Sequence, residues 1–179
     1  MTPGGDSCLK TPRRGAHAQR SFSEALDATG SLGDNAAMRS KVILLVEDNP
    51  DDVELTLRAF QKHNLSTDVV VARDGVEALD HLLPSTLPTS QVLPELVLLD
   101  LNLPKISGLE VLRRMRAEPR TRRVPVVVLT SSQEEKDIVS SYDLGANSFV
   151  QKPVDYTEFV DAARQLSLYW LELNESPNR

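Results

Sequence analysis

Ionisable side chains stand directly after three short apolar runs of this chain. Glu47 and Asp48 follow the first run, Asp100 follows another, and Lys152 follows the last. Buried carboxylates repel one another, and a divalent cation relieves that cost; oxygen ligands suit magnesium. A lysine beside such a centre suits a phosphoryl group, and carboxylate attack on phosphorus gives an acyl phosphate. These residue types therefore predict a magnesium-assisted aspartate that accepts a phosphoryl group.

The elements that must position these groups show as five apolar runs with β-branched residues, at 41–46, 68–72, 96–99, 124–129 and 148–150. The runs are too short for helices and suit strands buried on both faces. Stretches with helical spacing lie between them, so strand and helix alternate five times over about 130 residues. This alternation predicts an α/β fold, a doubly wound parallel sheet with helices on both faces. Ligands of such sheets bind at the carboxyl ends of the strands, where the ionisable groups lie.

The predicted helices have marked ends. Asn49 and Pro50 offer a cap and a proline in the first helical position. Gly145 is a plausible stop. Four further starts have a cap residue followed three later by Glu, the spacing of a capping box: Asp74/Glu77, Ser107/Glu110, Ser132/Glu135 and Asp155/Glu158.

Charge and composition exclude several classes of protein. Residues 1–40 hold five Lys/Arg against four Asp/Glu, whereas 41–179 hold fifteen against twenty-two, and this acidic body argues against a nucleic-acid-binding surface. No apolar stretch is long enough for a membrane span. The single cysteine, Cys8, gives no sign of an oxidising compartment, so we expect a cytoplasmic protein.

Two enzymatic or ligand-binding alternatives fit less well. Magnesium-dependent phosphatases that form an aspartyl phosphate usually carry a second acid two residues after the nucleophile, but Asn102 stands there. A nucleotide-binding domain would need a glycine-rich loop after the first strand, where 49–52 carries two acids instead. A signalling module remains the favoured interpretation.

The motifs now described resemble the response-regulator receiver domain of two-component signalling. They cover 41 to about 170 and agree in order and spacing: 46–49, 99–104 with Ser107-Gly108, 129–131 and 149–153. The resemblance implies a flavodoxin-like sheet of order 2-1-3-4-5. It also implies a protein that is not an enzyme beyond its own phosphorylation and dephosphorylation, with a sensor histidine kinase as partner.

The resemblance also implies roles for individual residues. Asp100 would accept the phosphoryl group. Asp48, Asp100 and the backbone carbonyl of Asn102 would bind Mg²⁺, with Mn²⁺ as a substitute, and Glu47 would act mostly through a metal-bound water. The phosphoryl-binding and switch positions would be Thr130, Ser131, Phe149, Lys152 and Pro153, with a Lys152–Pro153 bond that is typically cis in the family.

A narrower resemblance is to the small receivers that pair with phytochrome-type kinases. It rests on the long segment 83–94, on 141–147 and on Tyr169-Trp170-Leu171. Another sensor kinase, or an intermediate place in a phosphorelay, is the alternative. Output would pass to an unidentified downstream protein by conformational change and contacts.

The remaining expectations concern the ends of the chain. Residues 1–37 hold five of the eight glycines and no Val or Ile, which predicts a disordered tail over 1–38, with Met38 as a candidate start. We expect the receiver over 39–174 and a short tail over 175–179. The last helix, 155–174, has an apolar stripe beyond the need of the core, so we expect a homodimer through Tyr169, Trp170 and Leu173. Six arginines between 113 and 123 are expected to be a solvated helix end.

Overall fold

Strands and helices alternate along the whole of the part that the computed structural model describes, residues 41–61, 67–83 and 93–175. In chain order the elements are β1 (Lys41–Val46), α2 (Pro50–Gln61), β2 (Thr67–Ala72), α3 (Gly75–Leu82), β3 (Leu96–Leu99), α4 (Gly108–Ala117), β4 (Val126–Thr130), α5 (Glu135–Asp143), β5 (Ser148–Gln151), α6 (Tyr156–Ser167) and the π-helix η1 (Leu168–Leu173). The predicted tail, the candidate start Met38 and most of the segment 83–94 lie outside the described residues.

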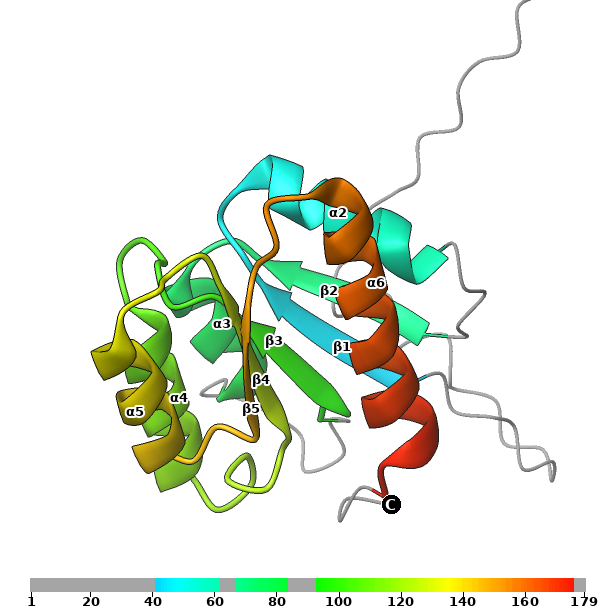
Figure 1. Cartoon of the computed structure of the whole chain (residues 1–179). Coiled ribbons are helices and arrows are strands. Elements are labelled where there is room, and N and C mark those ends of the chain that lie inside the picture. The colour runs from blue at the N-terminus through cyan, green and yellow to red at the C-terminus, as the bar shows by residue number, and fades with distance from the viewer. Residues whose placement is uncertain (1–40, 62–66, 84–92, 176–179) are drawn as a thin grey trace, which may run out of the picture.

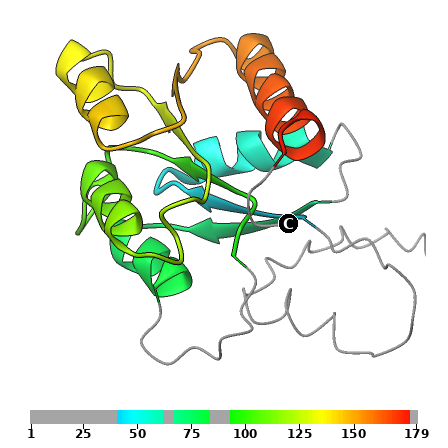
Figure 2. The ribbon, with the colours of Figure 1, turned by 90° about the horizontal axis from the view of Figure 1, so that it is seen from below.

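The five strands form one parallel sheet of order β2-β1-β3-β4-β5, which confirms the predicted α/β fold. Helices α2 and α6 cover one face, and α3 and α4 cover the other, with α5 beside α4 (Figures 1 and 2). Among the described helices, none combines the length and the apolar composition needed to cross a bilayer.

The central strand β1 shows why its sequence is apolar without alternation. Val42, Leu44 and Val46 pack into the core beneath α3 and α4. Ile43 and Leu45 point to the opposite face, into the core beneath α2 and α6. Both faces of the strand are therefore buried, as the continuous apolar run predicted.

Three of the four predicted capping boxes begin helices. The side chains of Asp74, Ser107 and Asp155 accept hydrogen bonds from backbone N–H groups of the first turn of α3, α4 and α6. The box at Ser132 is wrong, because α5 begins at Glu135 and the Ser132 hydroxyl donates to Asp137 at 2.6 Å. The Ser132 oxygen accepts from the Glu134 N–H at 3.3 Å, before the helix starts, and α5 has no side-chain cap.

The last helix also differs from the prediction of one uninterrupted α-helix. It continues as the π-helix η1, in which the Asn174 N–H donates to the Tyr169 carbonyl, five residues back. Leu171 is buried in this arrangement, and the Lys41 ammonium binds its carbonyl oxygen. A π-turn holds more residues than an α-turn, so side chains beyond Leu168 face other directions than in a continuous α-helix, which the apolar spacing did not predict.

One arginine of the predicted solvated cluster is structural. The half-buried Arg116 guanidinium donates to the Gly145 carbonyl at 2.8 and 3.0 Å, to the Val124 carbonyl at 3.0 Å and to Asn147 Oδ1 at 3.1 Å. Gly145 has a φ of 89°, a conformation that favours glycine, and ends the turn after α5 as predicted. Arg116 therefore ties the end of α4 to the turn before β5, whereas Arg120, Arg122 and Arg123 are exposed.

Candidate functional site: an acidic centre at the carboxyl edge of the sheet

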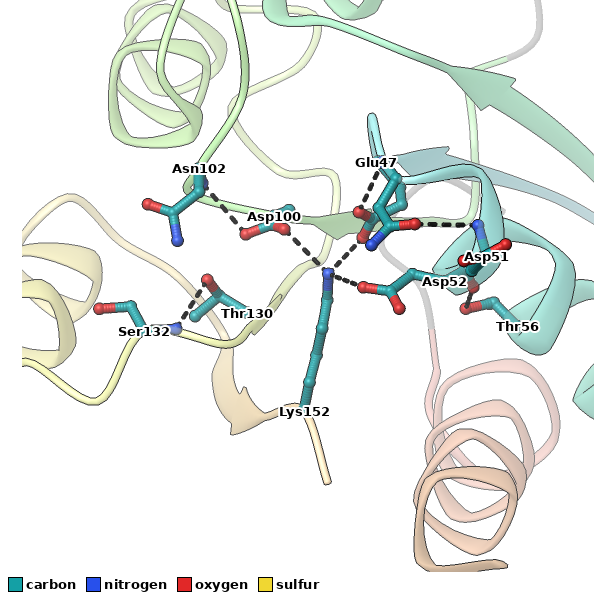
Figure 3. A network of polar contacts seen from close by, with 10 residues as sticks. Glu47, Asp51, Asp52, Thr56, Asp100, Asn102, Thr130, Ser132 and Lys152 are labelled. Carbon is teal, nitrogen blue, oxygen red and sulfur yellow. Dashed lines mark hydrogen bonds and ion pairs between the residues drawn. The ribbon is translucent and has the colours of Figure 1, made fainter. Parts of the chain in front are cut away.

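Four strands bring the predicted groups to one edge of the sheet. Glu47 and Asp48 follow β1, Asp100 follows β3, Thr130 ends β4, and Lys152 follows β5. Figure 3 shows these side chains, apart from that of Asp48, converging from separate elements. The prediction that the carboxyl ends of the strands would gather these residues therefore agrees with the geometry.

Backbone hydrogen bonds between neighbouring strands continue for one residue beyond the strand ends and fix the positions of the site residues there. The Glu47 N–H donates to the Ala72 carbonyl at 2.9 Å, and the Asp100 N–H donates to the Val46 carbonyl at 3.0 Å. On the other side, the Lys152 N–H donates to the Thr130 carbonyl at 2.8 Å. Glu47, Asp100 and Lys152 are thus anchored by their own backbone N–H groups at the edge of the sheet.

Three carboxylates form a group that suits a divalent cation. One oxygen from each of Glu47, Asp48 and Asp100 lies within 4.8 Å of the others. Glu47 is 3% exposed and Asp100 5%, whereas Asp48 is open to solvent. Oxygen donors with an open side match the preference of Mg²⁺, which keeps several waters and takes few carboxylates. The donor set therefore fits the metal that the sequence predicted.

Lys152 neutralises part of this charge. Its ammonium lies 2.5 Å from Glu47 Oε2, 2.9 Å from Asp100 Oδ2 and 2.9 Å from Asp52 Oδ2 (Figure 3). The side chain is 7% exposed, so its three N–H donors meet three carboxylates in a place with little water. The predicted pairing of Lys152 with the acidic centre is present, and Asp52 is a partner that the sequence analysis missed.

Burial and the lysine pull the ionisation of these groups in opposite directions. Burial raises the pKa of Glu47 to about 7, because it outweighs the hydrogen bond and the charge of Lys152. Burial also acts to raise the pKa of Asp100, but hydrogen bonds from Lys152, Thr130 and the Asn102 N–H bring it below its usual value. Burial acts to lower the pKa of Lys152, and its carboxylate partners raise it instead. Asp100 is therefore held ionised and Lys152 charged.

The loop after Asp100 is closely packed against its neighbours. The Asn102 N–H donates to Asp100 Oδ1 at 3.1 Å. A Cβ on Gly108 would lie 2.1 Å from the Asp100 carbonyl oxygen, and one on Gly75 would lie 2.1 Å from the Ile106 carbonyl oxygen. Only glycine fits at these two close approaches, so the loop that carries Asn102 has little freedom.

The remaining predicted site residues are placed less uniformly. Thr130 is buried beside Asp100, and its hydroxyl accepts from the Ser132 N–H at 3.3 Å. Ser131 is exposed, and Phe149 is half-buried on β5. The dimer candidates Tyr169, Trp170 and Leu173 lie apart from the site on η1, whose Glu172 pairs at 3.7 Å with Lys41, at the opposite end of β1.

The Lys152–Pro153 bond differs from the expectation, since no cis peptide bond occurs among the described residues. The trans form is intrinsically favoured by about 0.5–1 kcal/mol before proline. The ammonium reaches all three of its carboxylate partners from the trans backbone.

The partner that went unnoticed, Asp52, had a weak signal in the sequence. It stands in the first turn of α2, four residues after Asp48, where an acid also suits the start of a helix. The first turn of a helix that follows a strand lies over the same sheet edge as the strand end. Acids there are close to any cation held at that edge.

Comparison with known families agrees with this geometry. Residues 43–164 match the response regulator receiver domain. The chain belongs to this family, so the prediction of a signalling receiver rather than an enzyme is confirmed. Two curated relatives are the probable methanogenesis regulatory protein FilR2 of Methanothrix harundinacea, 39% identical over 76% of this chain and 87% of the relative, and the response regulator Rcp1 of Synechocystis, 36% identical over 74% and 90%.

Solved structures of phytochrome-associated receivers are similar throughout the folded part. The phosphorylated cyanobacterial phytochrome response regulator RcpA is 38% identical with a TM-score of 0.73, covering 77% of this chain and 99% of RcpA. The Mn²⁺-bound form of Rcp1 is 36% identical with a TM-score of 0.71 and covers 76% and 99%. The bacteriophytochrome response regulator AtBRR is 51% identical with a TM-score of 0.59 and covers 76% and 99%. The predicted likeness to phytochrome-associated receivers is thereby confirmed.

Proposed function

We propose that this receiver accepts a phosphoryl group from a sensor histidine kinase onto Asp100 and signals by conformational change and protein contacts. The observation that carries the proposal is the pairing of an ionised, buried Asp100 with Lys152 at one side of a three-carboxylate group. A cation would be held by Asp48, Asp100 and the Asn102 carbonyl, with Glu47 acting through water. Bound magnesium would supply positive charge to the transferring phosphoryl oxygens.

The chain's own residues account for the chemistry of transfer. An Asp100 oxygen forms the new bond to phosphorus while the bond from phosphorus to the kinase's histidine nitrogen breaks, and that electron pair stays on the imidazole. Lys152 offers a fixed positive charge to the phosphoryl oxygens, and Thr130 offers a hydroxyl. We propose Ser131, Phe149 and Pro153 as neighbouring switch positions, of which Phe149 would follow a movement of Thr130.

Labelling by acetyl phosphate with magnesium tests the proposal directly. The wild-type chain should gain one phosphoryl group by intact mass that hydroxylamine removes, and Asp100→Asn should gain none because the nucleophile is lost. Asp80→Asn, which changes an exposed carboxylate on α3, is the matched control and should label as wild type. Equal labelling of Asp100→Asn would refute the assignment of Asp100.

We further propose a phytochrome-type kinase as the partner and the cytoplasm as the location. The likeness to the phytochrome response regulator RcpA and to the bacteriophytochrome response regulator AtBRR supports the partner, and the lone cysteine supports the location. The likeness to FilR2, a probable methanogenesis regulatory protein, favours the alternative of another sensor kinase. Phosphotransfer profiling against the host's sensor kinases tests this: fastest transfer from a kinase without a light-sensing domain would refute the phytochrome pairing.

A homodimer through η1 is also proposed. Tyr169 is 51% exposed and Leu173 68%, while Trp170 is half-buried and meets Tyr169 edge to face at 5.1 Å. Exposed apolar side chains in a cluster favour an interface. Sedimentation of the wild type and of Leu173→Asp at micromolar concentration, with and without a phosphate analogue, should show a dimer that the variant weakens. A monomeric wild type would refute it.

A further inference from the structure

Asp52 contacts the site from an element that supplies none of its expected ligands. Its Oδ2 lies 2.9 Å from the Lys152 ammonium, and its side chain is 27% exposed. It is not one of the three carboxylates that converge as a metal-binding group, which are Glu47, Asp48 and Asp100. In Figure 3 it reaches the ammonium from α2, on the side away from Asp100.

The position of Asp52 is fixed by the start of α2. Asn49 caps this helix, since its Oδ1 accepts from the Asp51 N–H at 2.9 Å, and its carbonyl accepts from the Val53 N–H at 3.1 Å. The Thr56 hydroxyl donates to the Asp52 carbonyl at 2.8 Å. Asp52 therefore stands at the ammonium on a rigid turn rather than on a mobile loop.

Binding of a divalent cation changes the balance of charge around Lys152. Without the cation, the ammonium has Glu47, Asp100 and Asp52 as partners. A cation at the three-carboxylate group competes for the first two and repels the ammonium. Asp52 alone is free of that competition, so its pairing with Lys152 matters more in the metal-loaded protein than in the metal-free one.

We propose that Asp52 is a positioning residue that retains Lys152 at the site when Glu47 and Asp100 turn to a bound cation. This inference rests on the proposed function, because it assigns Asp52 a part in preparing the same centre. Asp52 lowers the free energy of the state in which metal and lysine are present together. By linkage it strengthens metal binding, and it keeps the ammonium in reach of the phosphoryl group that follows.

The experiment measures Mn²⁺ affinity of the full chain by calorimetry or by paramagnetic resonance. Asp52→Asn should bind Mn²⁺ about fivefold more weakly than Asp51→Asn, which removes the same charge from an exposed side chain in the same turn. In a Lys152→Met background, Asp52→Asn and Asp51→Asn should differ by less than about twofold, because the ammonium that Asp52 holds is gone. Asp52→Glu, which keeps the charge, should recover part of the affinity.

Each outcome bears on the proposal. Equal Mn²⁺ affinities of Asp52→Asn and Asp51→Asn would overturn it. A fivefold loss that persists in the Lys152→Met background would also overturn it, because the Asp52 charge would then act on the cation directly and not through Lys152. Either result leaves the proposed function standing if the wild type binds Mn²⁺ and is labelled on Asp100. A wild type that binds no Mn²⁺ and takes no label would overturn both.

Discussion

Glu47 and Glu110 are both glutamates in ion pairs, yet their ionisation shifts in opposite directions. Glu47 lies in the buried site beside Lys152, and burial raises its pKa to about 7. Glu110 lies in the first turn of α4, where hydrogen bonds from Arg113 and Arg114 lower its pKa to about 2. Contact with a cation is common to both, so the difference comes from the loss of water around Glu47.

The contrast indicates which ion pairs this fold depends on. The buried carboxylates of Glu47 and Asp100 have lost much of their hydration and share the Lys152 ammonium. Removal of this ammonium leaves buried negative charge without a partner. The carboxylate of Glu110 and its arginines remain hydrated, and such pairs add little to stability. Arg116 is intermediate: burial lowers its pKa, and its partners are carbonyl and amide oxygens rather than a carboxylate.

The largest effect is expected for Lys152→Met. Loss of the ammonium should lower the free energy of unfolding by about 3 kcal/mol near neutral pH without metal, because Glu47 and Asp100 lose their counterion. Urea denaturation measures it, with Lys136→Met as the control, since that exposed lysine pairs with Glu134 at 2.5 Å. Equal losses of unfolding free energy in Lys152→Met and Lys136→Met would contradict the distinction between buried and exposed ion pairs. With the metal present, Lys152→Met should still label on Asp100 but fail to change conformation.

An intermediate effect is expected for Arg116→Met. The variant leaves the Gly145 and Val124 carbonyls without their donor, which should cost about 1–2 kcal/mol of unfolding free energy. Arg113→Met, on the exposed side of the same helix, is the matched control and should change stability little. If Arg113→Met lowered the free energy of unfolding more than Arg116→Met, burial would not determine how much each arginine contributes to stability.

The smallest effect is expected for Glu110→Gln. Since the folded-state pKa of Glu110, about 2, lies below its ordinary value of 4.5, its contribution is present above pH 4.5 and is lost as the pH falls toward 2. The variant should be slightly less stable than the wild type near neutral pH, and the difference should vanish as the pH falls toward 2, so the variant's loss of stability between about pH 5 and pH 3 is the shallower. Urea titrations at both pH values check this, with Glu135→Gln as control; an unchanged slope would contradict it.

The fold could be predicted from sequence because its signals are local and redundant. A strand such as 41–46 is continuously apolar, since both faces are buried, and helix starts at Asn49, Asp74, Ser107 and Asp155 carry their own caps. The acidic group followed from topology, because parallel strands carry their terminal residues to one edge.

The parts that could not be predicted depend on competition between neighbours. The Ser132 hydroxyl bonds to the Glu134 N–H and to Asp137, yet α5 begins only at Glu135, and the spacing of residues does not show where the first turn starts. The contact between Asp52 and Lys152 could not be predicted without the position of the Lys152 ammonium, which lies 100 residues further along the chain. The same holds for Arg116, which the charge pattern grouped with exposed arginines.

The π-helix η1 links the direction of the last side chains to the number of residues in this segment. A π-turn spans one residue more than an α-turn, so deletion of a single residue within 168–173 would restore α-helical pairing and rotate everything beyond by roughly 100°. The direction in which Leu173 faces is thus set by chain length rather than by side-chain chemistry. A one-residue insertion or deletion therefore changes which side chains this end of the helix presents, while the phosphorylation centre at the other end of the sheet stays the same.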